Sequence, residues 1–243
     1  MLKDAIICFF KDFKFYFASK MIYLVLMVYI MLSVGIMFFV NNFYDDSSVN
    51  LRQFFISQPL VFAIVIPALT MRSFSDEYQN RTFEIILSQP ISRLSVIIGK
   101  FLAVTAICGI LLISSFVIWI ILACLLTLDN LWILGNYIST FLMCISLCAV
   151  SLFASSFTRH VIGAFILSLA ACSILINIDL GWISQLFTSR SMLALKIAGS
   201  FNFIQQYNDM IAGQISIASI LYFISLSVSF IWLSGAILDY KRR

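Results

Sequence analysis

The chain has 243 residues, of which 62% are hydrophobic and only 11% are charged, and its mean hydropathy is +1.05. Soluble domains contain roughly half apolar residues, so this composition excludes an ordinary soluble enzyme or binding domain. Because few polar residues remain, we expect one membrane domain over residues 1–243, without a linker or a separate catalytic domain. The formal net charge is +4, and its cations lie at the ends of apolar runs, which indicates membrane topology rather than nucleic-acid binding.

Residues 1–20 are aromatic and apolar, but charged residues interrupt them throughout. This interruption excludes the unbroken apolar core of a cleaved signal peptide. Phe10, Lys11 and Lys14 recur at helical spacing and predict an amphipathic helix that lies in the headgroup plane. The alternative interpretation is a frayed basic tail.

Six apolar runs are candidates for crossing the hydrocarbon layer, which is about 30 Å thick and needs about 20 helical residues. They cover residues 21–40, 54–71, 101–128, 137–157, 161–178 and 215–238. Pro59 and Pro67 remove backbone donors from the second run and predict kinks there. The third run is too long for an upright crossing, so we expect it to tilt or project beyond the bilayer, with a turn at Asp129.

The distribution of cations predicts the orientation of the chain. An N-terminus inside the cell places all but three of the fifteen Lys and Arg residues on the cytoplasmic side. The three that fall outside are Arg52, Arg190 and Lys196. Because cytoplasmic segments of membrane proteins are enriched in cations, we expect six spans with both termini cytoplasmic.

The stretch 73–88 is charged and amphipathic, and predicts a short surface helix between two apolar runs. Ser73 is suited to cap this helix, and Asp76 follows three residues later as in a capping box. Asp76 and Glu77 place negative charge where the helix dipole favours it. Pro90 disfavours a helical conformation at the preceding residue and ends the element. We therefore expect a helix of about four turns that lies flat on the membrane.

The order of residues in this part of the chain resembles the coupling-helix region of type-2 ATP-binding-cassette (ABC) export permeases, nearest to the gliding-motility and NosY-like branch. The residues that carry the resemblance are Pro67, Met71, Arg72, Glu77, Thr82, Glu84, Pro90, Gly99 and Lys100. A second match covers 201–233, where the family has an aromatic-rich approach, a glycine (here Gly213) and the last span. One departure is Arg81, because the family usually has glycine before the threonine.

The resemblance implies an all-α permease with an N-terminal elbow helix and a cytoplasmic coupling helix, in a bacterial inner membrane. It implies a second permease, identical or different, surrounding lipid, and two cytoplasmic ATPase subunits that hold ATP and magnesium and power export. The implied ATPase-coupling residues are Ser73, Asp76, Glu77, Arg81, Thr82, Glu84 and Pro90, and the elbow residues are Phe10, Lys11 and Lys14. The sequence contains no GxxxxGK[ST] phosphate loop, so we expect this chain not to bind ATP in that way itself. No metal-binding spacing of Cys, His or acidic residues is present either, so we expect no cofactor or metal on this chain.

Residues 179–214 are too polar to span a bilayer and too apolar for a plain loop. Their apolar residues recur three or four positions apart, which predicts short helices at the outer interface. Trp182 and Tyr207 are expected to anchor these helices at headgroup level. We interpret this region as an outer gate or cap that hinges at glycines. Its candidate residues are Trp182, Phe187, Gly199, Tyr207 and Gly213.

Small residues recur at helical spacing within the fourth apolar run. They are Cys144, Cys148, Ser151 and Ser155. Close helix packing explains such a stripe, and a soft-metal pathway through the two cysteines is the alternative. Gly99 and Ala103 form a further small pair that is suited to seat the third run against a neighbouring helix.

None of the six runs contains Asp, Glu, Lys, Arg or His, whereas ion-coupled carriers need such ionisable groups near the middle of the membrane. A permease driven by a partner therefore explains the sequence better than a self-powered carrier. Two other classes remain as alternatives, a membrane-embedded lipid-modifying enzyme and a membrane scaffold. The enzyme would need clustered acidic or histidine residues at the interface, and the chain has a single histidine, His160.

Overall fold

The computed structural model describes residues 2–39, 51–79, 93–125, 129–158, 160–177, 202–214 and 216–240. All regular structure within these ranges is helical, which confirms the all-α prediction. The helices are α1 (Leu2–Ala18), α2 (Met21–Phe39), α3 (Arg52–Gln79), α5 (Arg93–Ser114), α6 (Phe116–Leu125), α7 (Asn130–Ser155), α8 (Val161–Asn177), α11 (Phe203–Ile211) and α12 (Ile217–Tyr240).

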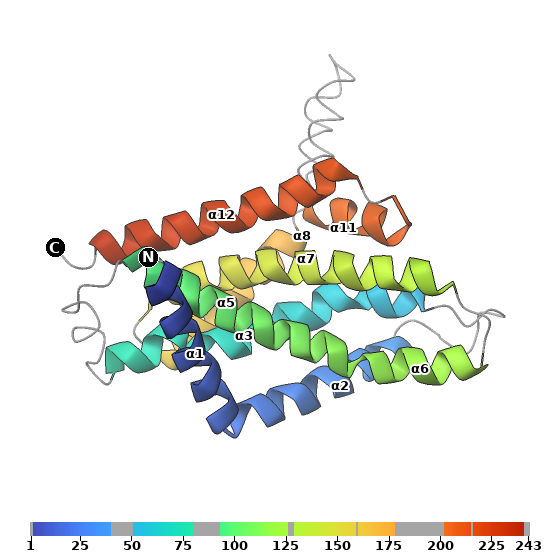
Figure 1. The fold of residues 1–243 in the computed structure, drawn as a ribbon, viewed down its shortest axis with the longest axis horizontal. Coiled ribbons are helices and arrows are strands. Elements are labelled where there is room, and N and C mark those ends of the chain that lie inside the picture. The colour runs from blue at the N-terminus through green and yellow to red at the C-terminus, as the bar shows by residue number, and fades with distance from the viewer. Residues whose placement is uncertain are drawn as a thin grey trace, which may run out of the picture.

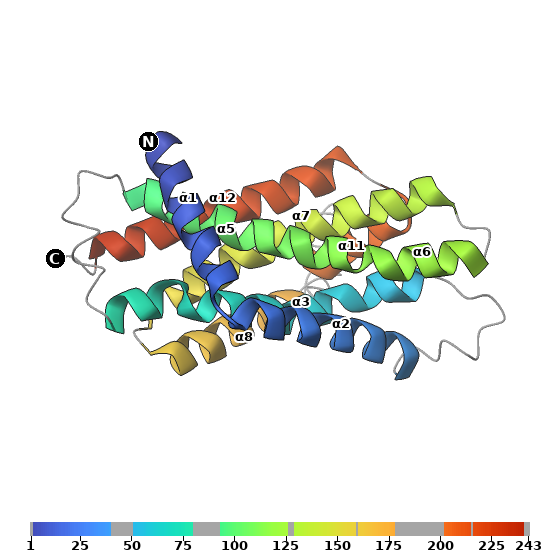
Figure 2. The same cartoon turned by 60° about the horizontal axis from the view of Figure 1, so that its bottom comes forward.

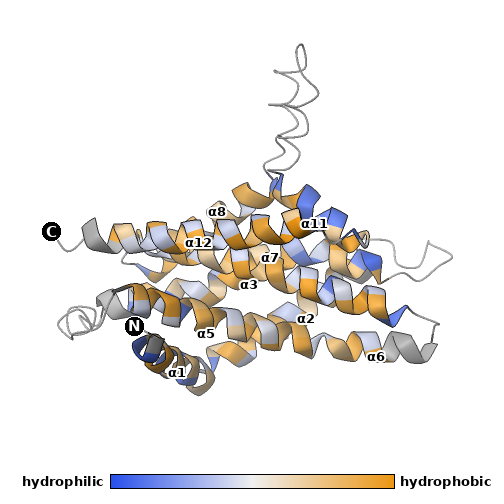
Figure 3. Cartoon of the chain, turned by 45° about the horizontal axis from the view of Figure 1, so that its top comes forward, coloured by the Kyte–Doolittle hydropathy of each residue, from blue (hydrophilic) through white to orange (hydrophobic). Residues whose placement is uncertain are grey.

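The long helices run side by side along the longest axis of the molecule, and α1 lies across them (Figure 1). The bundle is organised around α7, which packs against α3, α5, α8, α11 and α12. α1 and the last turns of α3 and α12 lie near one end, here named the α1 end, and α11 lies near the other, here named the α11 end (Figures 1 and 2). Apolar residues cover the long helices, whereas polar residues gather near their ends and on α11 (Figure 3).

Four segments of the described chain are long and apolar enough to cross a membrane. They are Arg52–Asp76, Leu94–Ile120, Asn130–Ser155 and Ile217–Ile237. Lys3–Ala18 and Met21–Ile36 pass the same criterion only together, and they are bent by 75° at the break between them. α8 is apolar but only 17 residues long. The fold is therefore that of a multi-pass membrane protein with four or five candidate spans, and the six-span layout stays a prediction.

The surface helix predicted to begin at Ser73 is not a separate element at its start. α3 continues without a break through Ser73 to Gln79, so Ser73 lies inside a helix and the prediction that it caps one is wrong. The physical reason is packing, because Phe74 is fully buried against Ile97 and Leu152 and holds the last turns of α3 on the bundle. α3 also remains helical through both of its prolines.

The third apolar run begins earlier than predicted and is interrupted. α5 begins at Arg93, and Ser115 separates it from α6. At this break the Ser115 N–H lies 3.3 Å from the Leu111 oxygen and 3.1 Å from the Leu112 oxygen, so it is shared between the two carbonyls. The Tyr137 hydroxyl donates to the Ser115 carbonyl at 3.3 Å. The long run is thus divided into two helices, α5 and α6, at a break that Tyr137 of α7 contacts.

Asp129 confirms the predicted turn before the fourth run and supplies its N-cap. Its backbone is extended, and its carboxylate accepts from the N–H groups of Leu131 and Trp132 at 3.1 and 3.5 Å. This cap starts α7 at Asn130, seven residues before the predicted start of the run at residue 137. Capped in this way, the helix extends beyond the apolar run.

The small-residue stripe of α7 is fully buried in the bundle. Ser151 meets the Thr70 hydroxyl of α3 and accepts at its carbonyl from the Ser168 hydroxyl of α8 at 3.1 Å. The Cys148 sulfur lies 3.6 Å from the sulfur of Cys108 on α5. Small side chains therefore let α7 approach three neighbours closely, as the packing interpretation requires. Within the described ranges, no three His, Cys, Asp or Glu residues are placed to hold a metal ion.

α1 crosses α5 at Gly99, where the two backbones meet. A Cβ atom on Gly99 would lie 2.6 Å from the Cβ of Cys8 and 3.0 Å from the carbonyl oxygen of Ala5. Only glycine permits this approach, because the colliding atoms belong to the α1 backbone or are fixed directly to it. Ala103, one turn later on α5, is fully buried.

The substitution Gly99→Ala should push α1 away from α5 and destabilise the protein by about 1–3 kcal/mol, the usual cost of overpacking. Gly35→Ala on α2 is the matched control, because a Cβ there meets nothing within 4 Å. The control should be neutral or slightly stabilising, since alanine favours helix over glycine. Thermal unfolding of the purified protein in detergent measures both effects, and equal midpoints for the two variants would disprove the close crossing.

Candidate functional site at the junction of α1, α3 and α5

Charged residues from three helices surround a cavity of about 500 Å³ at the α1 end of the bundle. α1 and the last turns of α3 supply most of the lining residues, and α5 contributes Lys100. The polar lining residues are Lys11, Asp12, Lys14, Tyr16, Arg72, Ser73, Asp76 and Lys100.

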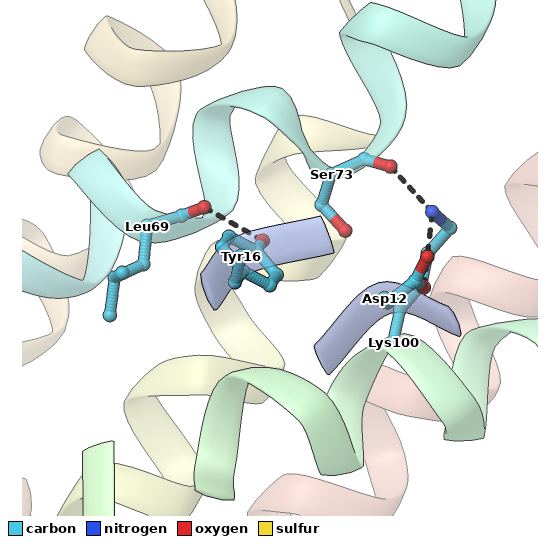
Figure 4. Close-up of polar contacts among 5 residues, drawn as sticks. All are labelled: Asp12, Tyr16, Leu69, Ser73 and Lys100. Carbon is cyan, nitrogen blue, oxygen red and sulfur yellow. Dashed lines mark hydrogen bonds and ion pairs between the residues drawn. The ribbon is translucent and has the colours of Figure 1, made fainter. Parts of the chain in front are cut away.

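Lys100 is the buried centre of this junction and is only 3% exposed. Its ammonium group donates to the Ser73 carbonyl of α3 at 2.7 Å and lies 3.6 Å from the Asp12 carboxylate of α1 (Figure 4). The same nitrogen lies 5.3 Å from the centre of the Phe74 ring, within the range of a cation–π contact. A buried ammonium is costly unless it is paired and hydrogen-bonded, so these contacts explain how Lys100 is tolerated in an apolar helix.

Tyr16 makes a second connection between α1 and α3. Its hydroxyl donates to the Leu69 carbonyl at 2.9 Å, and its side chain is buried (Figure 4). Burial, and next the Asp12 carboxylate, raise the pKa of the Tyr16 phenol, so the group remains protonated and able to donate. Asp12 and Tyr16 are four residues apart and share one face of α1. α1 is therefore attached to α3 directly through Tyr16 and indirectly through Lys100.

The structure brings together residues that the sequence placed in two separate predicted elements. Lys11 and Lys14 of the predicted elbow line the same cavity as Ser73 and Asp76 of the predicted coupling region. Phe10 is 54% exposed and does not line it. Of the other coupling residues, Glu77 lies in α3 but its side chain is outside the described part. Outside the described residues altogether lie Arg81, Thr82, Glu84 and Pro90.

The roles of Lys100, Asp12 and Tyr16 were not predicted from the sequence. One signal for Lys100 was available, because it is the single charged residue between Arg93 and Asp129 and a cation in such a run needs a partner. Nothing in the sequence identified Asp12 as that partner, since the two residues are far apart along the chain and α1 carries other charges.

The predicted outer cap is described only from residue 202 onward, so Trp182, Phe187 and Gly199 lie outside the described residues. α11 is amphipathic and buries one face against the bundle. Gly213 has a φ of +90° and turns the chain toward α12, as predicted. These observations show that the described part of this region is folded onto the bundle.

Tyr207 does not occupy the headgroup position predicted for it. It is fully buried, its hydroxyl donates to the Phe55 carbonyl of α3 at 2.9 Å, and the Thr140 hydroxyl lies 3.0 Å away. The side chain was predicted to anchor α11 in the headgroups, but it packs inside the bundle because its hydroxyl finds two polar partners there. It fixes α11 to α3 and α7.

Replacing Tyr16 by Phe removes one hydrogen bond at the junction and should weaken the docking of α1 by about 1 kcal/mol. Amide hydrogen exchange in α1 should then accelerate about fivefold if α1 opens locally. Tyr23→Phe on α2 is the control, because Tyr23 is 66% exposed and its removal should leave α1 unchanged. Unchanged exchange in the Tyr16 variant would contradict this role for the hydroxyl.

No curated protein sequence matches the chain. A family model described as ABC-2 family transporter protein matches residues 52–239, from α3 to α12, which is more than half of the chain. The matched part includes Lys100 and the last turns of α3, whereas α1 and α2 precede it. The chain belongs to the ABC-2 family of transporter proteins and is a membrane permease of an ABC transporter.

Proposed function

We propose that this chain is the permease subunit of an ABC exporter in a bacterial inner membrane. It works with a second permease, identical or different, and with two cytoplasmic ATPase subunits that bind ATP and magnesium. The observation that carries the proposal is the family match over residues 52–239, which implies an ATPase partner. The chain itself binds neither ATP nor magnesium and supplies the path through the membrane.

The proposed topology has six spans, with both termini in the cytoplasm. α2 and α8 each pack along α3, which supports counting them as spans despite their shorter length. The described cations gather at the α1 end of the bundle, whereas Arg52 begins α3 at the opposite end. Because cations are enriched on the cytoplasmic side, we assign the α1 end to the cytoplasm.

The proposed coupling begins where α3 leaves the bundle. Arg81, Thr82, Glu84 and Pro90 follow the end of α3 directly in the chain, and we propose that they contact the ATPase together with Glu77. A push on this segment would act on α3, which is one helix from Arg52 to Gln79. Lys100 and Tyr16 then pass the displacement to α5 and α1.

The proposed exit lies at the α11 end, under a cap that includes α11 and residues 179–201. Trp182, Phe187 and Gly199 are assigned to it from the sequence, and Tyr207 connects it to α3. Displacement of α3 would therefore disturb the bond between Tyr207 and Phe55 at the opposite end of the same helix. This arrangement gives the cap a mechanical connection to the cytoplasmic end.

The transporter function is favoured over a lipid-modifying enzyme by the chemistry of the junction. Its two carboxylates, Asp12 and Asp76, are outnumbered by cations, whereas a metal-dependent hydrolytic centre needs several grouped acidic or histidine ligands. No such group of three is found among the residues that the structure describes.

Reversing the charge at the proposed contact, with Glu84→Lys or Glu77→Lys, should reduce recovery of the ATPase with the tagged permease by roughly tenfold or more, because like charges at an interface cost several kcal/mol. Asp209→Lys is the matched control, since Asp209 is exposed on α11 at the opposite end. Co-purification from membranes measures the effect, with insertion checked by permease yield. Full ATPase recovery in both glutamate variants would contradict the proposed contact.

The orientation is tested by single cysteines in a cysteine-free variant. Asp209→Cys on α11 should react with an impermeant thiol reagent added to intact cells, whereas Lys20→Cys, between α1 and α2, should react only after permeabilisation. Both positions are exposed, so access rather than burial decides the labelling. Labelling of Lys20→Cys from outside would overturn the assignment of the α1 end to the cytoplasm.

A further inference from the structure

We propose that the cavity between α1, α3 and α5 binds the phosphate headgroup of an acidic phospholipid. Its volume of about 500 Å³ falls in the usual range for a small-ligand site, which is about 300–1,000 Å³. The family match begins at residue 52, so α1, which supplies most of the lining residues of the cavity, lies outside the matched part.

The charges of the lining select an anion. Four cations, Lys11, Lys14, Arg72 and Lys100, face two carboxylates, Asp12 and Asp76. Lys100 is held by Asp12 and the Ser73 carbonyl beneath the cavity, so most of the positive excess lies with exposed side chains around it. Arginine and lysine are the usual phosphate ligands, and basic pockets between membrane helices on the cytoplasmic side bind anionic headgroups.

The surroundings of the cavity favour a lipid over a free phosphate ion. Phe15 lines the cavity and is 55% exposed, and Phe10 and Ile7 are exposed on the same helix. Beyond the bend after α1, the first turns of α2 expose Leu24 and Met27. An aromatic and aliphatic surface next to a basic cavity suits acyl chains next to a headgroup.

Occupancy would join the two helices at the mouth of the cavity. Lys14 belongs to α1 and Arg72 to α3, and like charges that share one cavity repel each other. A phosphate between them replaces that repulsion with two charge-assisted contacts. The lipid would thus reinforce the same α1–α3 connection that Tyr16 and Lys100 make from beneath.

Native mass spectrometry of the full-length protein, purified in detergent with added phosphatidylglycerol or phosphatidylcholine, tests the site. Wild-type protein should retain one phosphatidylglycerol in preference to phosphatidylcholine. The variant Lys14→Gln with Arg72→Gln should bind it roughly 30-fold more weakly, the change expected from losing two cation contacts to an anionic lipid. The matched control, Lys3→Gln with Lys20→Gln, removes the same charge outside the cavity and should change binding less than about twofold.

A conservative pair, Lys14→Arg with Arg72→Lys, keeps both charges and should retain the lipid, which separates loss of charge from loss of folding. Equal retention of the two lipids by wild type, or equal loss in the cavity and control variants, would overturn the proposal. Inorganic phosphate is the competing source of the same chemistry. If phosphate alone raises the melting temperature as much as a short-chain phosphatidylglycerol does at equal concentration, the site is one for free phosphate and not for lipid.

An unchanged lipid content in the cavity variant, together with lost recovery of the ATPase, would instead make the cavity a protein contact and would also overturn the proposal. Lipid retention needs neither ATP nor a partner subunit. The measurement therefore stands or falls separately from the proposed transport function.

Discussion

The arrangement of this protein at its α1 end depends on a single buried positive charge. Lys100 is almost fully enclosed in the first half of α5, where its neighbours along the helix are mostly apolar, and an ammonium group in that position must be neutralised and hydrogen-bonded. Its partners come from two other helices, a carboxylate from α1 and a carbonyl from α3. Three helices that are distant in sequence are therefore held in one geometry, because the buried ammonium of Lys100 must be paired and hydrogen-bonded.

Gly99 makes this geometry sterically possible. α1 crosses so close to α5 at Gly99 that a methyl group would collide with it, and the crossing brings Asp12 within reach of Lys100 on the next residue. At the other end of α3, Tyr207 binds the Phe55 carbonyl and fixes α11. α3 is thus held by side-chain hydrogen bonds near both of its ends, which is the structural basis for our proposal that it connects the ATPase contact to the outer cap.

The parts of this fold that follow from local chemistry could be predicted from the sequence. Apolar run length predicted the helices, the carboxylate of Asp129 predicted a boundary, and Gly213 predicted a turn that needs a positive φ. Ser73 was misread because its capping signature is local, whereas the burial of Phe74 that keeps α3 helical there depends on residues of α5 and α7. The position of Tyr207 was not predicted for a similar reason, because an aromatic residue that anchors at headgroups and one that donates inside a bundle look alike in sequence.

The candidate site could be predicted only in part. Single residues were identified from the sequence, namely Lys11, Lys14, Ser73 and Asp76, but their meeting around Lys100 depends on the crossing of α1 over α5.

A double-mutant cycle on Asp12 and Lys100 tests whether this ion pair organises the junction of α1, α3 and α5. The free energy of unfolding would be measured for wild type, Asp12→Asn, Lys100→Met and the double variant in the same detergent. If the carboxylate neutralises the buried ammonium, each single change leaves the other group without its partner and lowers the free energy of unfolding. The double variant should then recover part of that loss. We predict a coupling free energy of about 1–3 kcal/mol between the two positions. Additive effects, within about 0.5 kcal/mol, would show that the two side chains are energetically independent and would contradict the claim that this pair organises the junction.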